Sequence, residues 1–94
     1  MSSHRATVEW KTEGDFARKK YLRAHVWRFD GGIEVKAAAS PSVVPLPWTR
    51  ADAVDPEEAL VASASSCHML TFLFLAANDG FVATSYVDEA VGHL

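Results

Sequence analysis

The residue in this sequence that points most directly to chemistry is Cys67, the only cysteine among the 94 residues. A thiolate is a strong nucleophile, but it persists only where a cation, a metal or a helix N-terminus stabilises it. The residues that would share the face of Cys67 on a helix carry no charge: Leu60, Ser63, Ala64, Leu70, Thr71 and Phe74. A reactive Cys67 therefore needs a cation from another segment, and without one it is a small buried hydrophobic residue.

Other kinds of site have little support in the sequence. One cysteine cannot form a disulfide within the chain, and we expect a reducing, cytoplasmic location. The four histidines show no metal-ligand spacing with one another or with Cys67, so we predict no metal site. Serine-type hydrolysis lacks the strand-to-helix turn that presents the nucleophile.

Residues 55–78 carry strong helix signals at both ends. Asp55 can cap the first turn, Pro56 suits the first helical position, and Glu58 can complete a capping box. Gly80 is a typical terminator. We therefore predict one long central helix over this range.

The predicted helix is unusually apolar. Its sequence carries no charge between Val61 and Asp79, so we expect protein to surround it on nearly all sides. Glu57 lies in its first turn, where the plainest role of a carboxylate is to complement the helix dipole.

The residues ahead of the helix alternate between apolar and polar side chains, as half-buried strands do. This period predicts about three antiparallel strands within residues 6–39, with a turn at Gly14-Asp15 and a hairpin at residues 30–32. Three prolines make residues 40–54 an extended loop, and residues 81–91 have the pattern of a further strand. The sequence therefore predicts one α+β domain, residues 1–94, in which an antiparallel sheet packs with a long buried helix.

Composition limits the possible partners. Nine Lys and Arg against twelve Asp and Glu give a net charge of −3, which argues against nucleic-acid binding. The longest nearly apolar run, residues 69–77, is shorter than the roughly 20 residues of a membrane-spanning helix, so we expect no membrane span. A chain of this size buries only about 60–65% of its unfolded surface, so we expect an oligomer.

The helix segment resembles a known family. Residues 55–63 (DPEEALVAS) and 65–70 (SSCHML) are similar to the OsmC/Ohr proteins, the osmotically inducible and organic hydroperoxide resistance proteins of bacteria. Residues 29–32 (FDGG) and 39–45 (ASPSVVP) are similar to the amino-terminal strands and the loop of an OsmC-like branch. The resemblance covers essentially the whole chain.

The resemblance implies a thiol-dependent peroxidase that reduces organic hydroperoxides. Cys67 matches the peroxidatic cysteine, and Glu57 matches a glutamate that pairs with an arginine. The family also has a resolving cysteine, which forms a disulfide with the nucleophile and is then reduced by a dithiol such as a lipoyl group. This sequence has no match for that cysteine, and we expect the carboxy-terminal portion that carries it to be missing. We expect no bound cofactor, and turnover would use an external thiol or another chain.

Four arginines come into question as the partner of Glu57. Arg23 is our choice because it shares a strand face with Tyr21, whereas Arg28 lies on the opposite face. Arg18 and Arg50 lie in expected loops and stay as alternatives.

The spacing of Glu57 and Cys67 sets a geometric problem. Ten residues along a straight helix separate them by about 15 Å and by roughly 80° around the axis. Either the helix breaks near residues 63–66, or more than one segment or subunit assembles the site. With the uncharged helix, this favours an intertwined homodimer.

Two functions therefore compete at the level of sequence. The first is a hydroperoxide-reducing enzyme that depends on Cys67. The second is a non-catalytic OsmC-like dimerisation or binding module, which the absence of a second cysteine keeps open.

Overall fold

The computed structural model describes residues 2–94, and within them the chain divides into two compact units. The first unit ends at Pro56 and holds all the strands. The second unit, Glu57–Leu94, holds nearly all of the helix and the segment that follows it.

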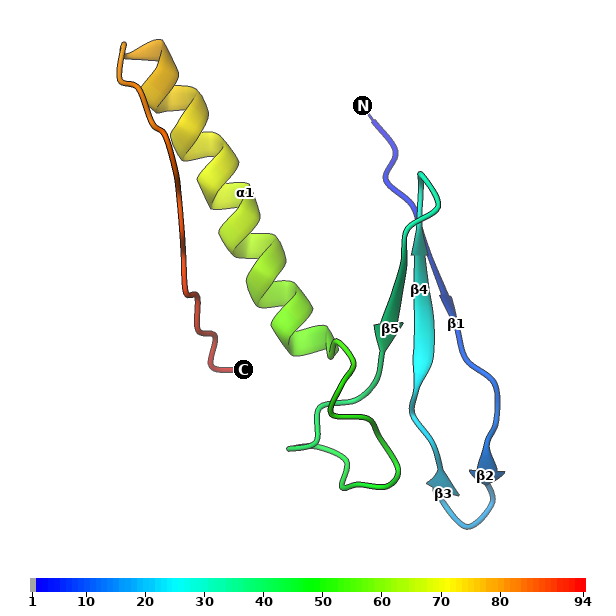
Figure 1. Ribbon diagram of the computed structural model, residues 1–94. Coiled ribbons are helices and arrows are strands. Elements are labelled where there is room, and N and C mark those ends of the chain that lie inside the picture. The colour runs from blue at the N-terminus through cyan, green and yellow to red at the C-terminus, as the bar shows by residue number, and fades with distance from the viewer. Residues whose placement is uncertain (1) are drawn as a thin grey trace. The chain divides into compact units, whose positions relative to one another are not determined.

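The first unit is built on a three-stranded antiparallel sheet, which confirms the predicted α+β class. Its strands are β1 (Ala6–Glu9), β4 (His25–Phe29) and β5 (Glu34–Ala37), in the spatial order β1-β4-β5 (Figure 1). In the register of the sheet, Val8 lies opposite Trp27. Because side chains alternate along a strand, this pairing places Val8, Trp27 and His25 on one face.

The hairpin between β4 and β5 turns at Gly31 and Gly32. Their φ values of 84° and 82° lie in the left-handed region, which glycine adopts without steric cost. The prediction of a hairpin at residues 30–32 is confirmed.

A short second sheet extends the first unit. Its two antiparallel strands are β2 (Gly14–Asp15) and β3 (Lys20–Tyr21). The prediction of a turn at Gly14-Asp15 is wrong, because these residues pair with β3 and the chain turns at residues 16–19 instead. The backbone N–H of Lys19 donates to the carbonyl of Phe16 and closes this turn.

The alternating segment that contains Arg23 is interrupted between β3 and β4. The backbone N–H of Leu22 donates to the Glu13 carbonyl, and that of Arg23 donates to the Trp48 carbonyl, each at 2.9 Å. These bonds take residues 22–24 out of the ladder with β1. Apolar and polar residues alternate in the same way in one long strand and in two short ones. The sequence therefore could not reveal the interruption between β3 and β4.

The loop expected at residues 40–54 has no helix or strand of its own and closes back onto β5. Val54 forms a parallel bridge with Ala37 and accepts a hydrogen bond of 3.0 Å from the N–H of Ala38. The Thr49 hydroxyl donates to the backbone carbonyl of Ala39, just before the loop begins. Among the described residues, Ala37, Ala38 and Thr49 are the buried ones, so the core of one chain is small.

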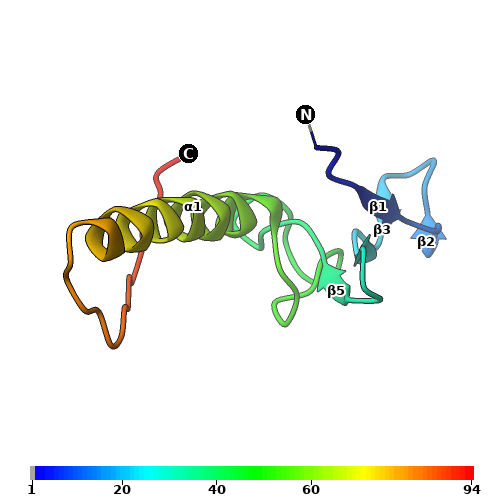
Figure 2. The same cartoon turned by 90° about the horizontal axis from the view of Figure 1, so that it is seen from above.

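The helix α1 (Pro56–Asn78) has the predicted bounds to within one residue. It is unbroken from end to end (Figure 2). At its end the N–H groups of Gly80 and Phe81 donate to the carbonyls of Ala77 and Ala76, and Gly80 has a φ of 83°. This is the Schellman arrangement, in which a glycine satisfies the last carbonyls, and it confirms the predicted terminator.

The expectation that α1 is buried on nearly all sides is wrong within a single chain. None of its residues is buried. Five of its large apolar side chains are between 50% and 66% exposed: Leu60, Leu70, Phe72, Phe74 and Leu75. The physical reason is that the segment after the helix covers only one stripe of it.

That segment, residues 81–94, runs alongside α1 without forming a strand (Figures 1 and 2). The prediction of a strand over residues 81–91 is therefore wrong for this chain, because no described residue pairs with its backbone in a ladder. The segment contacts the helix through side chains. Ser65 donates to Asp88 at 2.6 Å, and the rings of Phe72 and Tyr86 lie 6.0 Å apart.

By length and composition, α1 could cross a membrane. Its most apolar window of 18 residues has a mean hydropathy of 1.7, although the strictly apolar run within it is short. The core helices of soluble proteins meet the same two criteria, so length and hydropathy do not decide what surrounds α1. The expectation of no membrane span remains a prediction.

Candidate functional site

Cys67 lies near the middle of α1, and its thiol is free and exposed. The hydroxyl of Thr71 donates to the backbone carbonyl of Cys67 at 3.1 Å, the usual back-bonding of threonine in helices. Thr71 therefore serves the backbone rather than the thiol. The alternative that Cys67 is simply a buried hydrophobic residue does not hold within this chain.

Glu57 lies in the first turn of the same helix and is also exposed. Of the two alternatives left by the sequence, a helix break near residues 63–66 does not occur, because α1 continues through them. An unbroken helix keeps Glu57 and Cys67 about 15 Å apart along its axis. One copy of α1 therefore does not bring the two side chains together.

The arginine on β4 is engaged by carboxylates of the neighbouring strands. Arg28 donates from Nη2 to Glu9 and from Nε to Glu34, each at 2.9 Å. Hydrogen bonds to Glu9 and then to Glu34 raise the pKa of Arg28. The side chain thus ties β1 and β5 to the strand between them.

The two arginines expected in loops are also paired. Arg50 donates to both carboxylate oxygens of Asp52, at 2.9 and 3.0 Å, which raises the pKa of Arg50 and lowers that of Asp52. Arg18 lies 3.5 Å from Asp15. Each is therefore partly neutralised by a carboxylate two or three residues away in the sequence.

Arg23 differs from these three, because no carboxylate of the described residues forms an ion pair with it. Its guanidinium carbon lies 3.6 Å from the ring centroid of Tyr21, and Nη1 donates to the Tyr21 carbonyl. The carbonyl of Arg23 is hydrogen-bonded to Nδ1 of His25 at 2.7 Å. The aromatic face attracts the cation without neutralising it.

Arg23 faces a cavity of about 460 Å³ in the first unit. The lining is mainly apolar and aromatic: Val8, Trp10, Phe16, Tyr21, Arg23, His25, Ala38, Ala39 and Pro56. Apolar walls with few convergent polar groups are typical of small-molecule sites. Tyr21, Arg23 and His25 all line this cavity, although Arg23 lies between β3 and β4 and not on a strand.

Sequence reasoning missed two members of this cavity, Trp10 and Phe16. Their rings lie 5.9 Å apart, and each contacts Tyr21, at 5.7 and 4.8 Å respectively. Nε1 of Trp10 donates to the Leu22 carbonyl at 2.9 Å. The signal that could have located these rings was a hairpin of β2 and β3, because a short turn brings the residues on either side of it together.

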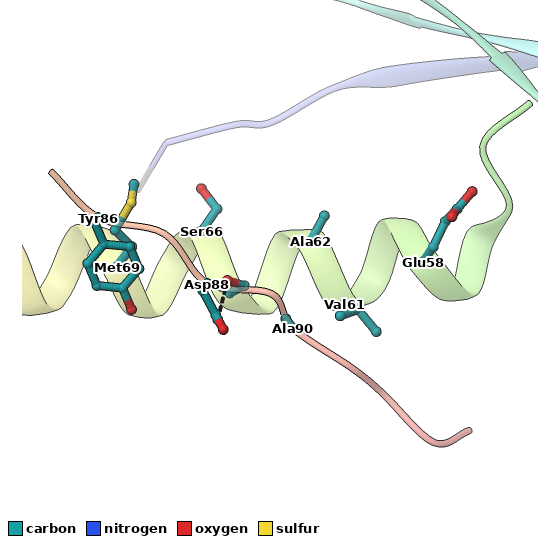
Figure 3. Close-up of a pocket in the computed structure, with 9 residues that line it drawn as sticks. Glu58, Val61, Ala62, Ser66, Met69, Tyr86, Asp88 and Ala90 are labelled. Atoms are coloured by element: carbon teal, nitrogen blue, oxygen red, sulfur yellow. Dashed lines mark hydrogen bonds between the residues drawn. The ribbon is translucent and has the colours of Figure 1, made fainter.

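A second cavity, of about 420 Å³, lies between α1 and the segment after it (Figure 3). Val61, Met69, Tyr86 and Ala90 supply apolar lining, and the hydrogen bond between Ser65 and Asp88 crosses it. Cys67 does not line this cavity. This cavity therefore belongs to the packing of the second unit.

No group of three His, Cys, Asp or Glu side chains within residues 2–94 is placed to hold a metal ion. Of the predicted site residues, Cys67 and Glu57 lie on α1, and Arg23 lies in the other compact unit. The arrangement offers a free thiol, a carboxylate and an unpaired guanidinium, which are groups suited to nucleophilic attack assisted by a cation.

The chain is similar to one solved structure in both sequence and fold. That structure is described as an OsmC-like protein of unknown function from Vibrio cholerae O1 biovar eltor. The two sequences are 52% identical and the TM-score is 0.94, over 99% of this chain and 62% of the other. The chain thus spans less than two thirds of the length of that protein. No protein-family model matches the chain, and no curated protein does.

Proposed function

Since this chain is OsmC-like in sequence and in fold, we propose that it is a thiol-dependent peroxidase that reduces organic hydroperoxides in oxidative stress defence. Cys67 is the nucleophile in this proposal. Arg23 supplies the positive charge that favours its thiolate and binds the peroxide, and Glu57 orients that arginine.

The observation that carries the proposal is the state of the four candidate arginines. Arg18, Arg28 and Arg50 are each paired with carboxylates of their own unit, whereas Arg23 is held by an aromatic ring beside an apolar cavity. A guanidinium without a carboxylate keeps donors for an anionic or polar ligand. This supports Arg23, the choice made from the strand pattern.

The first half-reaction oxidises the thiolate and reduces the peroxide. Sγ of Cys67 attacks the terminal oxygen of the hydroperoxide, and the O–O bond breaks. The departing alkoxide takes a proton and leaves as an alcohol. Cys67 is left as a sulfenic acid, which carries the transferred oxygen.

The second half-reaction returns Cys67 to the thiol and needs an external dithiol, because the chain has one cysteine. One thiol of the reductant condenses with the sulfenic acid, which releases water and forms a mixed disulfide. The second thiol attacks that disulfide, frees Cys67 and leaves the reductant oxidised. A lipoyl dithiol in the cytoplasm would serve, and the proposal includes no bound cofactor or metal.

The proposal includes a homodimer. The exposed apolar side chains of α1 are the surface that a second copy would cover, since burying such surface drives association. A second copy can also bring its own Glu57 or Arg23 to Cys67, which one unbroken helix cannot do for Glu57. The separation of the two residues thus supports a site with parts from two chains.

The test combines stoichiometric cumene hydroperoxide with the purified protein and follows intact mass and free thiol. We expect one added oxygen, absent in Cys67→Ser, and continuous peroxide loss once dihydrolipoamide is supplied. Arg23→Gln should slow thiol oxidation by about tenfold or more, the loss of a charged hydrogen bond. Arg18→Gln and Arg50→Gln should stay within about twofold, as surface substitutions usually do.

The competing function is a non-catalytic OsmC-like module for dimerisation or binding. The single cysteine favours it, because a complete cycle with two cysteines cannot run on this chain. If the wild-type protein removes hydroperoxide no faster than Cys67→Ser in the presence of the dithiol, the peroxidase proposal is wrong and the module is favoured.

A further inference from the structure

The side chain of Arg23 is held by Tyr21. Two contacts reach that residue: the guanidinium carbon lies 3.6 Å from the ring centroid, and Nη1 donates to the backbone carbonyl. Arginine has many rotamers. Ordering an unrestrained side chain on a ligand costs conformational entropy, which offsets much of the binding free energy of its contacts. The stacked geometry removes much of that freedom before any ligand arrives.

The ring of Tyr21 is itself held in place. Phe16 packs against it at 4.8 Å and Trp10 at 5.7 Å between ring centroids. The backbone of Tyr21 pairs with Gly14 in the two-stranded sheet, and Tyr21 is half-buried. The platform beneath Arg23 is thus a cluster of three packed aromatic rings and not an isolated side chain.

The backbone of Arg23 is anchored independently of its side chain. Its N–H donates to the Trp48 carbonyl at 2.9 Å, and its own carbonyl is bonded to His25. A change at the ring of Tyr21 therefore removes the support of the guanidinium and leaves the position of the Arg23 backbone to other contacts.

From these contacts we propose that Tyr21 is a positioning residue for Arg23: its ring holds the uncompensated guanidinium ready for the reaction at Cys67. This inference rests on the proposed peroxidase function. Tyr21 touches neither the peroxide nor the thiol in this scheme. Its ring face, rather than its hydroxyl, is the acting part.

The experiment measures the second-order rate constant for oxidation of Cys67 by cumene hydroperoxide in a single turnover. Tyr21→Leu should lower it by about fivefold, because the cation–π contact is lost. Tyr21→Phe keeps the ring face and should retain the wild-type rate. Phe29→Leu removes an exposed aromatic ring of the three-stranded sheet, outside the cavity, and is the control. Thermal unfolding of each variant checks that it is folded.

A double-mutant cycle separates this inference from the proposed function. Once Arg23→Gln is present, adding Tyr21→Leu should change the rate no further, because the ring acts only through the guanidinium. If Arg23→Gln slows oxidation and Tyr21→Leu does not, or if the two losses multiply, Tyr21 has no positioning role. If Arg23→Gln has no effect, the proposed role of Arg23 is wrong and the role of Tyr21 is overturned with it.

Discussion

Glu57 and Cys67 lie on one unbroken helix, ten residues apart, so the carboxylate cannot reach the thiol within a single copy of α1. The sequence motif suggests that Glu57 and Cys67 act together. The geometry of one chain keeps them apart. In the proposed peroxidase, charged groups must therefore reach Cys67 from outside its own copy of α1.

The first prediction is that the chain is a dimer in solution without detergent. The exposed apolar face of α1 is large for a monomeric protein, and a second copy would bury it. Sedimentation or light scattering should give twice the chain mass. Leu70→Glu, which puts a charge on that exposed face, should shift the population toward monomer. A monomeric wild type, or one that floats with lipid vesicles, would contradict the dimer.

The second prediction distinguishes a catalytic Glu57 from a helix-capping charge. Glu57 and Glu58 both lie in the first turn of α1, so loss of either removes a similar interaction with the helix dipole. Glu57→Gln should slow oxidation of Cys67 by about tenfold, the loss of one charged hydrogen bond. Glu58→Gln should change it by about twofold at most. Equal effects in both variants would assign Glu57 to the helix alone.

The third prediction concerns stability at low pH. Hydrogen bonds from Arg50, and then its charge, lower the pKa of Asp52 below its ordinary value. Ionised Asp52 therefore stabilises the folded state at pH values above its ordinary pKa. This contribution is lost as the pH falls through the lower pKa that Asp52 has in the folded protein. Melting temperatures between about pH 5 and about pH 2 should fall less steeply for Asp52→Asn. The difference should be small and should shrink in high salt, because the pair is exposed. An identical slope in both proteins would mean that the pair contributes nothing.

The fourth prediction concerns the segment after the helix. The hydrogen bond from Ser65 to Asp88, at 2.6 Å, is one of few polar contacts that hold residues 81–94 on α1. Ser65→Ala should speed chymotryptic cleavage at Tyr86 by about fivefold, in line with a charge-assisted bond on a partly open surface. Ser66→Ala, one position along the helix, is the control. Unchanged cleavage in Ser65→Ala would mean that the ring contact of Tyr86 with Phe72 holds the segment by itself.

Local signals predicted the elements of this fold well. The capping residues and Gly80 located α1 because helix ends need donors and acceptors that only certain side chains and conformations supply. Alternation and the paired glycines located β1, β4 and β5 for a similarly local reason. The α+β class followed from these elements.

The errors came from features that depend on distant partners. Burial of α1 and strand formation by residues 81–91 both depend on contacts with other segments, which a sequence pattern does not specify. The aromatic cluster around Tyr21 formed through the turn at residues 16–19, which was placed two residues too early. The strand pattern selected Arg23 as the candidate partner of Glu57, but its place in the cavity and its stacking on Tyr21 could be seen only in three dimensions.

Arg28 has a consequence beyond the stability of its ion pairs. Because strand side chains alternate, a slip of one residue between β1 and β4 would turn His25 to the opposite face of the sheet, away from the cavity. In the observed alignment Arg28 meets Glu9 on one side and Glu34 on the other. These two ion pairs favour the observed strand register over a shifted one. The same register places His25 in the cavity.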